Sequence, residues 1–152
     1  MRKILATTAT LGLTALGVIL PASGAQASAA CDTAWNSAVS GRFYAYDHTQ
    51  CSGFMGSTES WDSDWGNSSG PFQGDDTNKA SSILHKGTSG LAVQVFNGTG
   101  QDWAGGHTCL AKSEYYMSSL SGHTFTSGEP VNNGISSHRW VANGSCGKFL
   151  NS

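Results

Sequence analysis

The sequence predicts an all-β domain made of two tandem copies of one motif. Three observations support this fold class. The chain contains 20 glycines and is rich in Ser, Thr and Asn, only 12% of its residues are charged, and no segment shows a sustained helical periodicity. This composition is typical of short strands joined by turns. In addition, the pair Ser81-Ser82 recurs 55 residues later as Ser136-Ser137.

The repeat extends to the segments that precede each Ser-Ser pair. Upstream of the first pair lies an aromatic-rich stretch, residues 43–46, followed by polar residues and Gly53. Upstream of the second lies the apolar stretch 92–96, followed by polar residues and Gly105. An internal repeat has to be recognised before other features are used to assign the fold. The same order of strand, turn and second strand is therefore expected in both halves.

Strands are expected where β-branched and aromatic residues lie between turn signals. The expected strands are residues 42–46, 53–58, 81–85, 91–96, 105–112 and 137–140. Residues 31–41 are expected to form an irregular lead-in, and residues 114–117 a single short helical turn. Residues 122–131 are expected to be a long polar connection.

Two loops concentrate oxygen-bearing side chains at a bend. One is Asn132-Asn133-Gly134-Ile135-Ser136-Ser137, and the other is Thr77-Asn78-Lys79-Ala80-Ser81-Ser82. Calcium takes oxygen ligands from amide, hydroxyl and carbonyl groups. Asn and Ser also shape tight turns without any metal, and the spacing alone favours that simpler interpretation. The presence of two copies adds weight to a metal site.

At these residues the chain resembles the βγ-crystallin superfamily. Each Greek-key motif of that superfamily carries an aromatic-x4-aromatic-x-Gly corner and a calcium loop of the form (Asn/Asp)-(Asn/Asp)-x-x-(Ser/Thr)-Ser. Residues 132–137 match the loop at every position, whereas residues 77–82 begin with threonine instead of Asn or Asp. The corners match less closely, because residues 46–53 have Cys51 in place of the second aromatic and residues 96–105 contain two additional residues.

The resemblance covers residues 42–141 and implies a βγ-crystallin-like sandwich of two Greek-key motifs. The motifs would span residues 42–86 and 91–141, and residues 142–152 would form a C-terminal strap.

The resemblance also implies one or two weak calcium sites. Asn132, Asn133 and Ser136 would hold one ion, together with a backbone carbonyl from the hairpin of the other motif. A second and weaker site would comprise Thr77, Asn78 and Ser81. Because carboxylates are few, the affinity is expected near the range of extracellular modules, about 10⁻⁴ M.

Residues 1–27 are expected to be an export signal. Arg2 and Lys3 precede an uncharged apolar run over residues 4–20, and Ala25-Gln26-Ala27 offers a small-x-small cleavage pattern. The run is short and too diluted by Thr and Gly for a membrane anchor. The remaining residues, 28–152, would form one secreted, extracellular and monomeric domain. With six basic and ten acidic residues its net charge is −4, and it has no basic patch, so neither nucleic acid nor membrane is expected as a partner.

The four cysteines are Cys31, Cys51, Cys109 and Cys146. An even number in a small exported domain predicts two disulfides, and the sequence leaves three pairings open. A zinc site is disfavoured because the cysteines are scattered and lack C-x2-C spacing. Within the two-motif fold, we favour Cys31 with Cys51 and Cys109 with Cys146, because each bond would tie one chain end to the adjacent motif.

No catalytic motif is present, and the protein is not expected to be an enzyme. The chain lacks both H-E-x-x-H and Gly-x-Ser-x-Gly. His85 and His138 fall on equivalent strands of the two halves, which favours a structural role. Asp62 and Asp64 lack the twelfth-position acid of an EF-hand and are interpreted as solvated. The five tryptophans, which are Trp35, Trp61, Trp65, Trp103 and Trp140, could fill the core or form a platform for sugars.

Together with the signal and the cysteines, the repeats are most similar to bacterial secreted peptidase inhibitors of the Streptomyces metalloproteinase inhibitor type. This resemblance implies an extracellular protease as the partner. The segments around Cys109 and residues 122–131 are candidates for the loop that such an inhibitor would present. The alternatives within the superfamily are a killer-toxin-like antimicrobial protein and a cell-wall carbohydrate-binding structural module.

Overall fold

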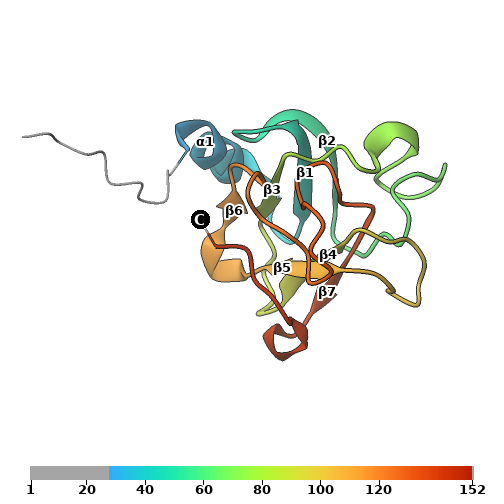
Figure 1. The fold of residues 1–152 in the computed structure, drawn as a ribbon. Coiled ribbons are helices and arrows are strands. Elements are labelled where there is room, and N and C mark those ends of the chain that lie inside the picture. Colours follow the sequence, from blue (N-terminus) through green and yellow to red (C-terminus); the bar gives the residue numbers. More distant parts are fainter. Residues whose placement is uncertain (1–27, 152) are drawn as a thin grey trace, which may run out of the picture.

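Two antiparallel β-sheets make up the fold of residues 28–151, which are the residues that the computed structural model describes (Figure 1). One sheet has the strand order β2-β1-β3-β6, and the other has the order β5-β4-β7. The strands are β1 (Phe43–His48), β2 (Ser52–Thr58), β3 (Ser82–His85), β4 (Ala92–Phe96), β5 (His107–Leu110), β6 (Tyr116–Met117) and β7 (Ser137–Val141). The predicted all-β sandwich is therefore confirmed.

Each half of the chain contributes a segment to the sheet of the other half. In the four-stranded sheet, β6 from the second half pairs with β3, and Met117 lies opposite Ile83. In the other sheet, Asp62 from the first half forms an antiparallel bridge to His138 of β7. The 55-residue offset that relates the two Ser-Ser pairs also relates these two pairings. The two halves are therefore interlocked by equivalent contacts.

The Ser-Ser pairs anchor each half to its own hairpin in the same way. The hydroxyl of Ser82 donates a hydrogen bond of 2.6 Å to the carbonyl of His48. The hydroxyl of Ser137 donates a hydrogen bond of the same length to the carbonyl of Gly98. In both halves the second serine of the pair thus fixes the start of the hairpin turn.

The main hydrophobic core is filled from both halves. It contains aromatic and aliphatic residues of both halves, including Phe43, Trp65, Phe72, Ile83, Val93, Val95, Leu110, Phe125 and Ile135. All five residues of β4 are buried. The tryptophans are divided between core and surface, because Trp65 is fully buried whereas Trp61 is 48% exposed.

The interpretation of Asp62 as a solvated acid is wrong. Its side chain is buried, and its carboxylate accepts a hydrogen bond of 3.0 Å from the amide of Asp64 and a longer one, 3.4 Å, from the amide of Phe72. Burial raises the pKa of this carboxyl group. Asp62 therefore organises the turn between the bridge to β7 and the buried aromatic residues.

The lead-in expected to be irregular contains a helix, α1 (Ala29–Ser37). Ser28 caps its N-terminus, since its hydroxyl accepts a hydrogen bond from the amide of Cys31. The helix has nine residues and buries Cys31, so the sequence shows no repeating apolar positions that would predict it. The N-cap serine, the alanines and Asp32 were the available signal. The turn expected at 114–117 lies slightly earlier, as a 3₁₀ turn at Lys112–Glu114, and β6 follows it.

Two disulfides tie the chain ends to the sandwich. Cys31 is bonded to Cys51 in the β1–β2 connection, and Cys109 of β5 is bonded to Cys146, which is the pairing favoured from the sequence. The tail beyond Cys146 runs alongside β5 as a parallel bridge, with the amide of Leu150 donating to the carbonyl of Cys109. Disulfides are typical of oxidising, extracytoplasmic compartments.

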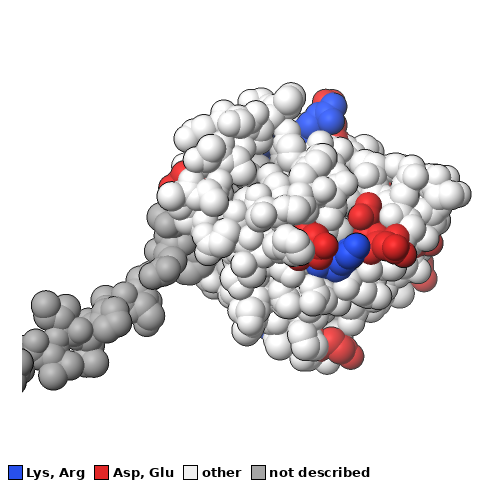
Figure 2. Space-filling view, turned by 90° about the horizontal axis from the view of Figure 1, so that it is seen from above, with Lys and Arg blue, Asp and Glu red and all other residues white. Residues whose placement is uncertain are grey.

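The surface carries few charged groups. Figure 2 shows a face on which Lys, Arg, Asp and Glu are sparse and most of the area is uncharged. Across residues 28–151, none of the helices has the length and apolar character needed to cross a membrane. The predicted export signal, residues 1–27, lies outside the described residues.

Candidate metal-binding site

The two Asn/Ser loops contact each other directly. Asn78 and Asn133 occupy equivalent positions, and both adopt a left-handed backbone, with φ of 57° and 56°. Asparagine tolerates this conformation better than most residues. The amide of Asn78 donates to the carbonyl of Ile135, and the amide of Asn133 donates to the carbonyl of Ala80, each over 2.9 Å. The loops are thus joined by a symmetric pair of backbone hydrogen bonds.

Three side-chain oxygens meet at one end of this contact. The hydroxyl of Thr77 donates to the hydroxyl of Ser136 over 3.1 Å, and that hydroxyl donates to the amide oxygen of Asn78 over 3.0 Å. Ser136 is buried and Asn78 is exposed. The three oxygens, named here the first cluster, therefore lie between the protein interior and the surface.

An equivalent contact forms at the other end. The hydroxyl of Ser81 donates to the amide oxygen of Asn133 over 3.0 Å, which repeats the bond between Ser136 and Asn78. Asn132 stands where the first loop has Thr77 and is half-buried. Ser81 and Asn133 are named here the second cluster.

The grouping of these residues differs from the one expected. The sequence assigned Asn132, Asn133 and Ser136 to one site and Thr77, Asn78 and Ser81 to the other. In the structure each cluster takes oxygens from both loops, so that Ser136 lies with Thr77 and Asn78, and Ser81 lies with Asn133. The exchange follows from the interlocking of the halves, which spacing along the chain cannot reveal.

The two clusters also differ in the segments of the chain that form backbone hydrogen bonds to them. The amide of Trp65 donates to the carbonyl of Ser136, and the equivalent amide of Leu120 donates to the carbonyl of Ser81, each over 2.9 Å. The residue before Trp65 is Asp64, whereas the residue before Leu120 is a serine, Ser119. The segment bonded to Ser136 thus carries a carboxylate next to its donor amide, and the segment bonded to Ser81 carries a hydroxyl there.

Asp64 and Thr77 of the first cluster both lie close to Gly66. Oδ1 of Asp64 accepts a hydrogen bond of 2.9 Å from the amide of Gly66. A Cβ placed on Gly66 would be 3.3 Å from both Asp64 Oδ1 and Thr77 Cγ2. The sequence did not indicate a role for this carboxylate near the loops, because Asp64 fits only the start of an EF-hand pattern and lies outside both Asn/Ser loops. The 55-residue offset, applied to the segment before each loop, was the signal that could have found it.

Other donor sets are less suited to a metal. Within residues 28–151, no three His, Cys, Asp or Glu side chains gather in a way that could hold an ion. The amide and hydroxyl oxygens of the two clusters do converge, and they are of the type that hard cations prefer.

The two buried histidines form a separate, symmetric feature. His138 accepts a hydrogen bond from the indole N–H of Trp65 at Nδ1 (2.9 Å), and its Nε2 lies 3.2 Å from the carbonyl of Ser60. His85 accepts from the amide of Gly87 at Nδ1 (3.1 Å), and its Nε2 lies 2.9 Å from a backbone carbonyl. Both rings are therefore neutral with the proton on Nε2, as a structural role requires.

Comparison with solved structures identifies a similar fold. A structure described by the words "Evolution of the eye lens beta-gamma-crystallin domain fold" matches with a TM-score of 0.50 and 16% sequence identity, over 69% of this chain and 89% of that chain. At this identity the likeness shows the fold alone, which is that of a βγ-crystallin domain. No family model matches the sequence, and no curated protein matches it. The finer resemblance to peptidase inhibitors gains no support from these comparisons.

Proposed function

We propose that the protein is an extracellular calcium-binding module with the βγ-crystallin fold, and not an enzyme. The observation that carries this proposal is the first cluster, in which the hydroxyl oxygen of Ser136 lies 3.1 Å from that of Thr77 and 3.0 Å from the amide oxygen of Asn78. Calcium binds six to eight oxygens at 2.3–2.6 Å, so neighbouring ligand oxygens lie about 3 Å apart. The donor set and its spacing therefore fit this ion.

The first cluster is the stronger of the two proposed sites. We expect the carboxylate of Asp64, which precedes Trp65 and lies close to Gly66 as Thr77 does, to supply a negative charge, whereas the segment bonded to Ser81 has Ser119 at the equivalent position. Affinity of calcium sites rises with the number of charged ligands. This order reverses the sequence-based one, in which the loop at 132–137 was expected to be stronger because it matched the superfamily pattern best.

Calcium titration by calorimetry tests the proposal. The unmodified protein is expected to bind calcium with a Kd of about 10⁻⁴ M, and Asn78→Ala is expected to weaken the stronger site at least about tenfold. Asn133→Ala is the matched control, because it removes the equivalent side chain from the same left-handed backbone. Asp64→Asn is expected to weaken the stronger site while keeping the hydrogen bond to Gly66.

Thermal unfolding supplies a second measure of the same binding. At about 10 mM calcium the folded state is expected to gain about 2.7 kcal/mol, since the ion is then about 100 times its Kd. If the unmodified protein shows no heat of binding and no rise in Tm with calcium, the calcium proposal is removed. Equal losses in Asn78→Ala and Asn133→Ala would contradict the proposed order of the sites.

Peptidase inhibition is a second candidate function, and a rigid exposed turn favours it. Residues 126–130 are exposed, and backbone bonds from Phe125 to Glu129 and from Gly128 to Phe125 close the turn. The ring of Phe125 is buried and anchors the turn to the core. Such preorganisation lowers the entropic cost of binding. The other candidate segment is unsuitable, because Cys109 is fully buried in β5.

Inhibition assays against a thermolysin-like metallopeptidase and a subtilisin-like serine peptidase test this candidate. We expect 1:1 inhibition of the metallopeptidase, and we expect the double variant Ser127→Ala/Glu129→Ala to weaken it at least about tenfold. Ser89→Ala, in an exposed loop elsewhere, is the control. If neither peptidase is inhibited, the inhibitor candidate is removed and the calcium proposal is unaffected.

A further inference from the structure

A cleft of about 440 Å³ opens between β7 and two loops, within the size range of small-molecule sites. Its aromatic lining comes from Trp61, Trp103 and Trp140, and its polar lining includes Glu59, Gln101 and Arg139. These residues come from three segments that are distant in sequence and belong to both halves of the chain. We name this site the tryptophan cleft.

The tryptophans present rings in fixed orientations. Trp61 is 48% exposed, and its ring is perpendicular to that of Trp103, with 6.1 Å between the centroids. The indole N–H of Trp140 donates to the carbonyl of Ser60, which holds this ring as a wall of the cleft. Exposed aromatic groups that are held in place mark binding surfaces more often than isolated apolar residues do.

Trp103 is also held in an unfavourable backbone conformation. Its φ is +54°, which is rare for a bulky side chain. Such strain persists only where the surroundings enforce it, and it is concentrated at ligand sites. Here the ring of Phe96 lies 5.4 Å from that of Trp103, and the guanidinium group of Arg139 lies 5.0 Å from its centroid. The strained backbone thus holds an aromatic ring in the cleft.

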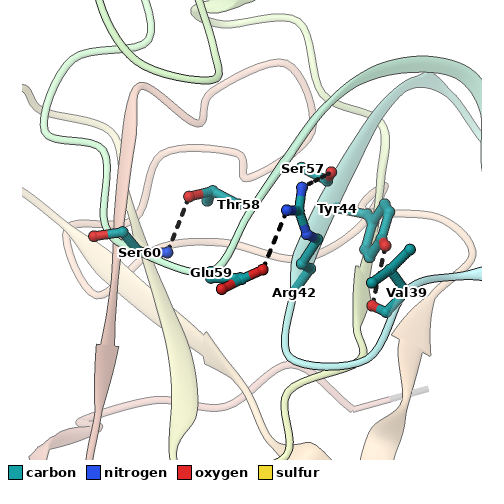
Figure 3. Close-up of polar contacts among 7 residues, drawn as sticks. All are labelled: Val39, Arg42, Tyr44, Ser57, Thr58, Glu59 and Ser60. Carbon is teal, nitrogen blue, oxygen red and sulfur yellow. Dashed lines mark hydrogen bonds and ion pairs between the residues drawn. The ribbon is translucent and has the colours of Figure 1, made fainter.

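The polar groups of the cleft balance one another in charge. Glu59 forms an ion pair of 3.1 Å with Arg42, shown in Figure 3, and faces a lining that contains Arg139. Arg139 donates from Nε to Gln94, and among the described residues its terminal N–H groups have no hydrogen-bond partner. The lining contains one carboxylate and one guanidinium group, so neither sign of charge dominates it. The cleft therefore suits a neutral ligand with both apolar faces and hydroxyl groups.

A peptide strand fits this site less well. Peptides commonly bind by adding a strand to a free sheet edge. β7 is an edge strand, but Asp62 covers it at His138 through a pair of backbone hydrogen bonds of 3.0 and 2.8 Å. The ring faces and side-chain polar groups remain as the means of recognition.

We propose that the tryptophan cleft binds a neutral oligosaccharide. The apolar C–H faces of the sugar rings would pack on Trp61 and Trp103. The hydroxyl groups would accept hydrogen bonds from Arg139 and Gln101 and donate to Glu59. This site is separate from the calcium clusters and does not depend on them.

Titration with defined neutral tetrasaccharides tests the proposal, using chitotetraose, cellotetraose and laminaritetraose, with tryptophan fluorescence and calorimetry as readouts. We expect saturable binding of at least one of them and a loss of at least about tenfold in Trp61→Ala. Phe54→Ala is the matched control, because it removes an exposed aromatic ring of the other sheet, and it is expected to keep the affinity. Gln101→Ala tests the same cleft through an exposed side chain if Trp61→Ala does not fold.

Three outcomes would overturn the proposal. These are the absence of saturable binding for all three sugars, an equal affinity in Trp61→Ala and the unmodified protein, and a loss in Phe54→Ala as large as that in Trp61→Ala. Competition with a neutral tetrapeptide distinguishes the peptide alternative. Stronger binding of the peptide than of every sugar would assign the cleft to peptides.

Discussion

Replacing Trp65 with alanine is expected to lower the free energy of unfolding by about 4 kcal/mol, within the usual range for removing a large buried aromatic side chain. The ring is fully buried and stacks on Phe72 with 4.1 Å between the centroids. Its N–H is also the hydrogen-bond donor to Nδ1 of His138. The variant would therefore leave both a cavity and an unpaired buried acceptor. Urea unfolding near pH 7 measures the change.

Two further variants separate these contributions. Trp65→Phe keeps most of the stacking and loses the N–H donor, so an intermediate loss of about 2 kcal/mol is expected. Trp61→Ala is the matched control, since the half-exposed ring fills no core space and its loss is expected to be below about 1 kcal/mol. A loss in Trp61→Ala equal to that in Trp65→Ala would contradict the assignment of Trp65 to the core.

The stability of the fold is expected to fall as the pH decreases below about 6.5. Burial lowers the pKa of His138 from 6.5 to about 3. Between these values the unfolded chain binds one more proton than the folded chain, so the stability from His138 is complete above pH 6.5 and decreases by about 1.4 kcal/mol per pH unit below it. Between pH 7 and pH 4 the expected loss is about 3 kcal/mol.

Two other buried groups modify this dependence. Burial also lowers the pKa of His85, which adds to the loss at low pH. Burial raises the pKa of Asp62, which acts in the opposite direction, because the folded state then binds a proton more readily than the unfolded state. Urea unfolding at pH 7, 5.5 and 4 measures the net slope. In His138→Gln the slope is expected to decrease by about one proton, and an unchanged slope would refute the role of His138.

Most of the strands could be predicted from the sequence because their signals are local. β-branched and aromatic residues between turn signals gave the positions of β1 to β5 and β7 to within two residues at each end. β6 was missed because it has two residues and exists through its pairing with β3. The helix α1 was missed for a similar reason, since its burial depends on a disulfide to a distant hairpin.

The candidate site was only partly predictable. The loop residues carried a recognisable pattern, but the arrangement of Ser136 beside Asn78 depends on how the halves interlock. Asp64 lies close to Gly66, as Thr77 of the first cluster does, although it comes from a segment before the loop, and the tryptophan cleft combines three separate segments. Spacing within one stretch contains no information on such contacts between distant stretches.

The exchange of segments between the halves has a consequence for how the chain folds. Neither sheet is complete without a contribution from the opposite half, as the pairings of β6 with β3 and of Asp62 with β7 show. A half that formed first would leave backbone donors and acceptors without partners along one margin. We therefore expect both halves to fold together. The repeat in the sequence does not correspond to two autonomous folding units.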